Sequence, residues 1–142
     1  MNPAGSAYVL DTSAVIALLE AEEGADRVGE ILRRENVFLP FPVALELYYL
    51  TLRQRGEARA DARHAALKAL RVSHLNVVDE ATMLTAGRFK ALYPLSCADA
   101  MIAAFAARQD AVLVHKDPEF EKLRDHVKQE RLPYKPRGRR SR

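Results

Sequence analysis

Short apolar runs alternate along this chain with longer segments of helical periodicity. Buried strands are predicted by four of the apolar runs, at residues 8–10, 37–39, 75–78 and 111–115. Apolar residues spaced three and four apart predict helices over residues 14–19, 24–35, 43–54, 58–70 and 80–92, and a last one after Ser96. A short edge strand is expected at residues 131–134, where a proline is tolerated. The alternation indicates an α/β fold with a mostly parallel central sheet.

Length and composition favour a single domain. The 142 residues are 49% hydrophobic, which allows a sizeable core but not two of them. Cys97 is the only cysteine, which excludes a disulfide framework and a cysteine-based zinc site and suits a reducing cytosol. No basic segment precedes an apolar run at the start, and Asp11 interrupts the first such run. We therefore expect no signal peptide, no membrane span and a cytoplasmic location.

The net charge of +3 arises at the end of the chain. Between Lys128 and Arg142, seven Lys and Arg accompany one acid, Glu130, so the preceding residues carry 15 basic and 18 acidic side chains. We expect one domain over residues 1–134 and a basic, disordered tail over residues 135–142. Such a tail either aids solubility or seeks phosphate groups.

Four acids stand where a carboxylate is unusual. They are Asp11 after the first strand, Glu46 in an apolar helix, Asp99 in the first turn of another, and Asp117 after the fourth strand. Each has a structural alternative, because Asp11 and Asp117 could cap helices, Asp99 could form a capping box with Ser96, and Glu46 could lie on an exposed edge. If the first and fourth strands are neighbours in a parallel sheet, the four acids can gather at one edge.

A cluster of this kind calls for a cation. Two unit charges about 4 Å apart repel by roughly 4 kcal/mol at an effective dielectric near 20. Oxygen ligands without cysteine or paired histidine favour Mg²⁺ or Mn²⁺ over Zn²⁺. The bound ion could activate a water and stabilise charge on a phosphodiester, while the hydroxyls of Thr12 and Ser13 could orient a carboxylate or a water.

The sequences around these acids resemble the PIN domain family. They are Asp-Thr-Ser at residues 11–13, Glu46 in Ala-Leu-Glu-Leu, Asp99 in Ser-Cys-Ala-Asp-Ala-Met-Ile-Ala-Ala, and Asp117 after Val-Leu-Val-His-Lys, within a similarity that spans about residues 8–134. The resemblance implies a three-layer α/β/α sandwich and an Mg²⁺- or Mn²⁺-dependent ribonuclease. Asp11 and Asp99 would be the main metal ligands, Glu46 would support them, and Asp117 would complete the site.

At this length the chain looks most like the VapC-type toxins of type II toxin-antitoxin systems. That resemblance implies an RNA substrate, a small antitoxin partner and a homodimer. The surface of Tyr48, Tyr49 and Leu52 could serve such a dimer, although aromatic residues at helical spacing more often belong to a core.

His115 departs from the family pattern, which usually has Thr or Ser two residues before the last acid. The histidine would contact phosphate, or else pack or face solvent. This departure and the basic tail leave open a PIN-like module that binds RNA or a partner protein without cutting. Aspartyl-phosphate phosphatases also place an Asp after the first strand, but they need a second acid two residues later, where this chain has Ser13.

Overall fold

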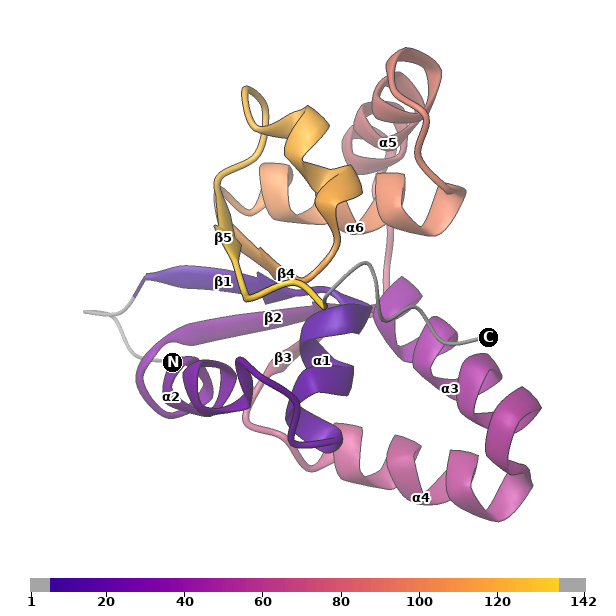
Figure 1. The fold of residues 1–142 in the computed structure, drawn as a ribbon. Coiled ribbons are helices and arrows are strands. Elements are labelled where there is room, and N and C mark those ends of the chain that lie inside the picture. Colours follow the sequence, from indigo (N-terminus) through magenta and orange to yellow (C-terminus); the bar gives the residue numbers. More distant parts are fainter. Residues whose placement is uncertain (1–5, 136–142) are drawn as a thin grey trace.

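A computed structural model of the chain describes residues 6–135, in which strands and helices alternate (Figure 1). The strands are β1 (Ala7–Leu10), β2 (Asn36–Pro40), β3 (Ser73–Leu75), β4 (Val112–His115) and β5 (Gln129–Arg131). The helices are α1 (Thr12–Leu19), α2 (Ala25–Arg34), α3 (Phe41–Arg55), α4 (Glu57–Lys68), α5 (Glu80–Leu92), α6 (Cys97–Arg108) and the 3-10 helix η1 (Pro118–Leu123). The predicted tail lies outside the described residues, apart from Lys135.

The five strands form one parallel sheet in the order β3-β2-β1-β4-β5. At its centre, Val9 and Leu10 of β1 and Leu113 and Val114 of β4 are fully buried, as expected of strands covered on both faces. Because β1 and β4 are parallel neighbours, the loops that follow them leave the same edge of the sheet side by side.

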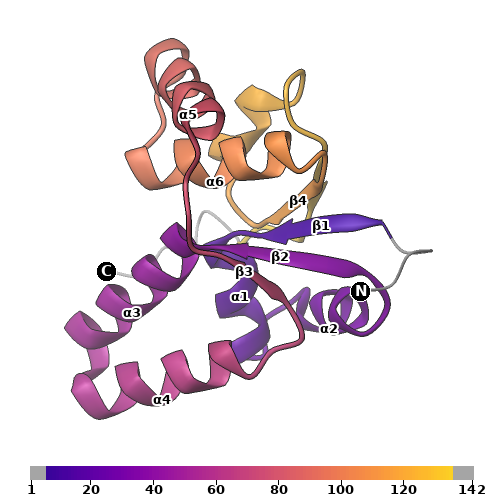
Figure 2. The same cartoon turned by 180° about the vertical axis from the view of Figure 1, so that it is seen from behind.

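Helices cover both faces of this sheet. α1, α2 and the α3–α4 hairpin lie on one side, and α5 and α6 lie on the other (Figure 1). The view from behind shows the connection from β3 to α5 passing between the two helical layers (Figure 2). The predicted three-layer α/β/α sandwich is therefore confirmed, with a sheet that is parallel throughout. Among the described residues, no helix has the length and apolar character needed to span a membrane.

Two edge strands were predicted in the wrong place. β3 ends at Leu75, because the chain then leaves the sheet and runs to α5 on the opposite side from α4. Val77 in this connection is 81% exposed. β5 begins at Gln129 instead of residue 131, since the backbone of Leu113 pairs with Lys128 and Glu130 forms an ion pair with Arg27 of α2. Edge strands are only partly buried, so an apolar run marks them poorly.

Gly24 gives a test of the backbone that leads into α2. Its φ of +101° favours glycine, and an added Cβ would lie 3.2 Å from the Cβ of Leu132. Gly24→Ala is therefore expected to lower the free energy of unfolding by about 2 kcal/mol in urea denaturation. Gly87→Ala in α5 is the control, because an added Cβ there meets nothing within 4 Å and should stabilise the helix by up to about 1 kcal/mol. Equal effects of the two substitutions would contradict the strain at Gly24.

Candidate active site

The carboxyl ends of β1 and β4 bring the first and last predicted acids to one edge of the sheet. The pairing aligns Leu10 with Val114, and the backbone N–H of Asp11 donates to the carbonyl of Val114 at 3.1 Å. Asp117 follows β4 in the adjacent loop. The charges of Asp99 and Asp117 act on Asp11, and that of Glu46 acts on Asp99. The structure thus brings the four predicted acids together, and we call Asp11, Glu46, Asp99 and Asp117 the acid cluster.

Asp11 is the most buried member of the acid cluster, with 3% of its surface exposed. It caps α1, because its Oδ1 accepts the backbone N–H of Ala14 at 2.9 Å. The Ser13 hydroxyl lies 2.8 and 2.9 Å from the two carboxylate oxygens and accepts the backbone N–H of Lys116 at 2.8 Å. Ser13 therefore joins the loop after β1 to the loop after β4.

Thr12 makes the matching link to α3. Its hydroxyl donates to Oε1 of Glu46 at 2.5 Å. Glu46 is half-buried and bonded at its carboxylate, so the alternative of an acid on an exposed edge is wrong. The two neighbouring hydroxyls thus hold one carboxylate each, Ser13 that of Asp11 and Thr12 that of Glu46.

The capping roles that were weighed against a functional site are also present. The backbone N–H of Asp99 donates to the hydroxyl of Ser96, the N-cap of α6, at 3.1 Å. The carboxylate of Asp117 accepts the backbone N–H of Glu119 at 3.0 Å and caps η1. Capping and clustering are therefore compatible. The capping hydrogen bonds hold the starts of α6 and η1 in place, and with them the acids that belong to the cluster.

Burial and mutual repulsion raise the pKa of two acids in the cluster. Burial raises the pKa of Asp11 to about 8, and the charges of Asp99 and Asp117 add to this, against the hydrogen bonds from Ala14 and Ser13. Burial also raises the pKa of Asp99 to about 6, with the charges of Glu46 and Asp117 next in size. Carboxyl groups whose pKa is raised in this way mark candidate sites for cation binding or catalysis.

A hard divalent cation fits the chemistry of these donors, which are all carboxylate oxygens. Lys116 does not neutralise them, since its ammonium group contacts Glu22 at 3.3 Å and the carbonyl of Glu23 at 3.0 Å. Over residues 6–135, no three Asp, Glu, His or Cys side chains already surround a single point as metal ligands.

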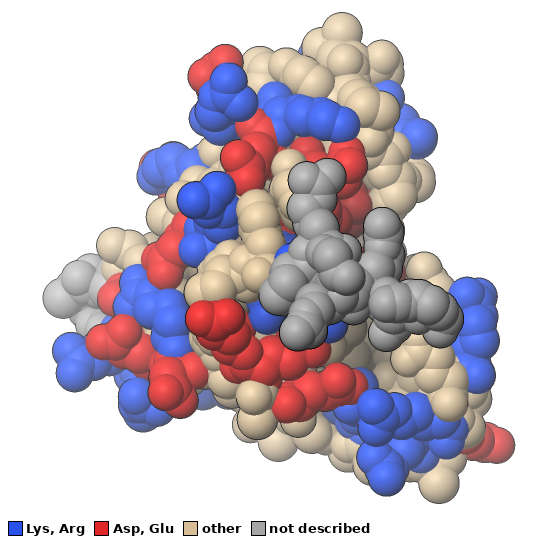
Figure 3. Space-filling model, in the orientation of Figure 1, with Lys and Arg blue, Asp and Glu red and all other residues tan. Residues whose placement is uncertain are grey.

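Sequence reasoning missed two residues beside the cluster. Glu119 adds its negative charge to those acting on Asp99, and the only signal for it was a second acid close after Asp117. Lys116, whose side chain is 5% exposed, gave no signal beyond its place between β4 and Asp117. Both residues line a cavity of about 770 Å³ next to Asp117, together with Ser13, Tyr134 and Lys135. Acidic side chains gather across the middle of this face of the molecule (Figure 3).

His115 is completely buried, at 0% exposure. Its ring centroid lies 5.3 Å from that of Phe120 and 6.2 Å from that of Tyr134, and burial lowers its pKa. The prediction of a packed side chain is confirmed. The alternatives of a solvent-facing ring or a direct phosphate contact are wrong, because no part of the ring reaches the surface.

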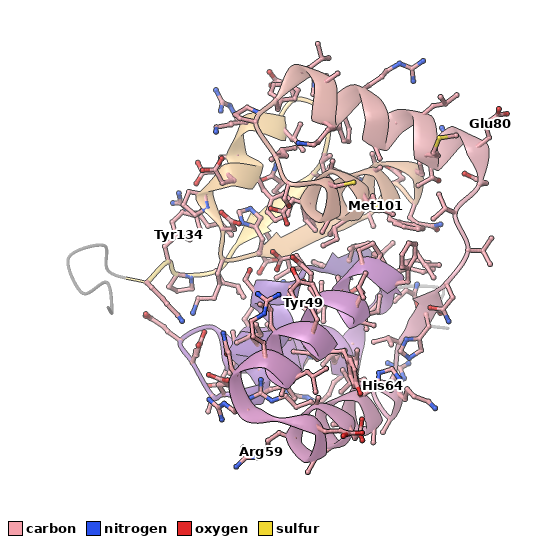
Figure 4. The ribbon with its side chains drawn as sticks, turned by 90° about the vertical axis from the view of Figure 1, so that its right-hand side faces the viewer. Tyr49, Arg59, His64, Glu80, Met101 and Tyr134 are labelled. Carbon is pink, nitrogen blue, oxygen red and sulfur yellow. The ribbon has the colours of Figure 1, made fainter. Side chains whose placement is uncertain are left out.

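The outer face of α3 carries an apolar stripe that is not part of the core. Leu45, Tyr49 and Leu52 are 57%, 38% and 41% exposed, so the expectation that the aromatic surface is core does not hold for Tyr49 and Leu52. Tyr48 instead donates a hydrogen bond to Asp61 of α4 at 2.9 Å. Tyr49 on α3 and Met101 on α6 can be located in Figure 4. The stripe is therefore an exposed apolar surface on α3.

Similar solved structures share this fold. VapBC2 from Rickettsia felis, bound to a DNA fragment from its promoter, is 14% identical with a TM-score of 0.74, covering 89% of this chain and 99% of that one. VapBC-1 from nontypeable Haemophilus influenzae is 24% identical with a TM-score of 0.70, covering 88% and 97%. VapC20 from Mycobacterium tuberculosis, described as a sarcin-ricin loop cleaving toxin, is 17% identical with a TM-score of 0.64, covering 81% and 93%.

Sequence comparison identifies the family. No curated protein sequence matches this chain. The sequence profile of the PIN domain, however, matches residues 8–125, which is most of the chain and includes every member of the acid cluster. This match agrees with the order of the strands and with the acids at the ends of β1 and β4. The chain therefore belongs to the PIN domain family.

Proposed function

We propose that this chain is an Mg²⁺- or Mn²⁺-dependent endoribonuclease and the toxin of a type II toxin-antitoxin pair. The observation that carries the proposal is the acid cluster, in which burial and repulsion raise the pKa of Asp11 to about 8 and that of Asp99 to about 6. The family match supports it, as does the likeness to a structure described as a toxin that cleaves the sarcin-ricin loop.

Each residue of the site has a definite task in this proposal. Asp11 and Asp99 hold the cation, and Glu46 and Asp117 support it. A cation held by these residues would supply a counter-charge for the phosphodiester and would make a water molecule a better nucleophile. Ser13 and Thr12 fix the carboxylates of Asp11 and Glu46 through the hydrogen bonds described above, which limits the reorganisation needed on metal binding.

The cavity beside Asp117 offers a place for the RNA strand. Its volume of about 770 Å³ exceeds what a single nucleotide needs, and it opens next to the acid cluster. Lys116 and Lys135 line it, although both also pair with Glu22, and the Tyr134 ring gives an aromatic wall. Lysines and an aromatic ring suit phosphate contacts and base stacking, respectively.

A small antitoxin partner, a homodimer and a cytoplasmic location are parts of the same proposal. Several of the similar structures are VapBC toxin-antitoxin assemblies. The exposed stripe of Leu45, Tyr49 and Leu52 on α3 is the surface we assign to a protein partner or to a second copy.

Cleavage of an RNA panel tests the enzymatic function. The purified chain is incubated with single-stranded and structured RNAs in Mg²⁺, in Mn²⁺ or in chelator. Cleavage should occur with either metal, stop on chelation and return when excess metal is added. RNA binding without cleavage, combined with no binding of Mn²⁺, would instead favour a PIN-like module that binds RNA without cutting it.

A further inference from the structure

The ring of His115 is hydrogen-bonded at both nitrogens. Its Nδ1 accepts the backbone N–H of Asp117 at 3.1 Å, and its Nε2 lies 2.9 Å from Oε1 of Gln129 on β5. Since the ring is fully buried, neither nitrogen can exchange its protein partner for water. The ring therefore connects the edge strand β5 directly to the backbone of an acid in the cluster.

The partners of His115 define which nitrogen carries the proton. The amide N–H of Asp117 can only donate, so Nδ1 must be the acceptor. The side-chain amide of Gln129 donates through its Nε2 to the carbonyl of Phe120 at 2.7 Å, which leaves its oxygen facing the ring. His115 is consequently a neutral imidazole that is protonated at Nε2, so both ring nitrogens and both polar atoms of the Gln129 side-chain amide have a hydrogen-bond partner.

The same bonds hold the Asp117 loop from both sides. His115 fixes the backbone at Asp117 itself, while Gln129 fixes Phe120 in η1, the helix that Asp117 caps. The rings of His115 and Phe120 also pack together, and Phe120 is fully buried. Hydrogen bonds thus hold the backbone of this loop at Asp117 and again at Phe120. They limit how far the carboxylate of Asp117 can turn away from the acid cluster.

We propose that His115 and Gln129 are positioning residues that set the direction of Asp117, with a ring nitrogen accepting the bond that orients the loop. The effect of this positioning on metal affinity rests on the function proposed above. The edge strand β5 then contributes to the active site through Gln129, although it carries no residue of the acid cluster.

Two substitutions at His115 separate the two bonds. In His115→Asn, the amide oxygen takes the place of Nδ1 and still accepts the N–H of Asp117, while the reach to Gln129 is lost. In His115→Gln, the longer side chain carries its amide to the former position of Nε2. It then offers no acceptor to the backbone N–H of Asp117. Gln129→Met removes both bonds of Gln129 with little change in length. His74→Asn and Gln109→Met make the same chemical changes at exposed positions and serve as controls.

The first readout is hydrogen exchange of the Asp117 amide in metal-free protein. Its protection should persist in His115→Asn and fall at least about tenfold in His115→Gln. The second is the affinity for Mn²⁺, which should fall about tenfold or more in His115→Gln and Gln129→Met and stay within about threefold in His115→Asn. Nitrogen chemical shifts of the unsubstituted chain should show Nε2 protonated, a result that needs no variant to fold.

A ring protonated at Nδ1 would overturn the proposal, as would equal exchange of the Asp117 amide in His115→Asn and His115→Gln. Where the unsubstituted chain binds Mn²⁺, equal Mn²⁺ affinity in these two variants would overturn it as well. If the unsubstituted chain bound no Mn²⁺ and cut no RNA, the proposed function would fail. Amide exchange and the chemical shifts would then still decide whether His115 directs Asp117.

Discussion

Asp11→Asn is expected to reduce metal-dependent RNA cleavage by at least about a hundredfold and to raise the melting temperature of the metal-free protein. Asparagine keeps an oxygen that can accept the N–H of Ala14, so the cap of α1 survives. It removes a charge that is disfavoured by burial and by Asp99 and Asp117. Activity and metal-free stability should therefore change in opposite directions, which loss of structure alone would not produce.

The comparison uses initial cleavage rates in Mg²⁺ and thermal melting in chelator at about pH 8.5, where much of Asp11 is ionised. Asp99→Asn should also reduce cleavage strongly, with a smaller gain in stability because Asp99 is only half-buried and its pKa is about 6. Asp26→Asn, at an exposed position in the first turn of α2, is the matched control and should leave cleavage unchanged. Cleavage that survives Asp11→Asn would remove Asp11 from the site.

The sequence predicted best those strands that are buried on both faces, because burial gives them a continuous apolar run. β1 and β4 lie in the centre of the sheet, and their apolar runs marked both strands to within a residue. β3 and β5 are edge strands of sequence Ser-His-Leu and Gln-Glu-Arg, whose positions depend on pairing with β2 and β4. Nothing in three polar or mixed residues indicates that pairing.

A similar division applies to the site. The four acids were visible because a carboxylate beside apolar residues is costly unless it has a partner. The roles of Ser13 and Gln129 were less visible, because they arise from contacts between loops and strands that are distant in sequence. Ser13 bonds the backbone of Lys116, and Gln129 bonds a histidine on the neighbouring strand. Such contacts appear only once β1, β4 and β5 lie side by side.

The metal-free protein is expected to lose stability as the pH rises from about 6.5 to about 8. Over this range folded Asp11, with a pKa of about 8, keeps a proton that the unfolded chain, with its ordinary value of 3.8, has released. A raised pKa stabilises the fold below the unfolded value, and this contribution is lost as the pH passes the folded value. Urea unfolding in chelator should show a fall of up to about 2 kcal/mol across this window.

Below pH 6.5 two other groups obscure this effect, which is why the window starts there. Asp99, with its pKa of about 6, acts in the same direction as Asp11, whereas burial lowers the pKa of His115 and makes stability rise with pH up to about 6.5. Above that pH most of the fall should come from Asp11, and most of it should disappear in Asp11→Asn. Saturating Mg²⁺ should flatten it as well, because a bound cation favours the ionised carboxylate. Stability that rises with pH in chelator would contradict the raised pKa, whereas a fall that Mg²⁺ leaves unchanged would place the cation elsewhere.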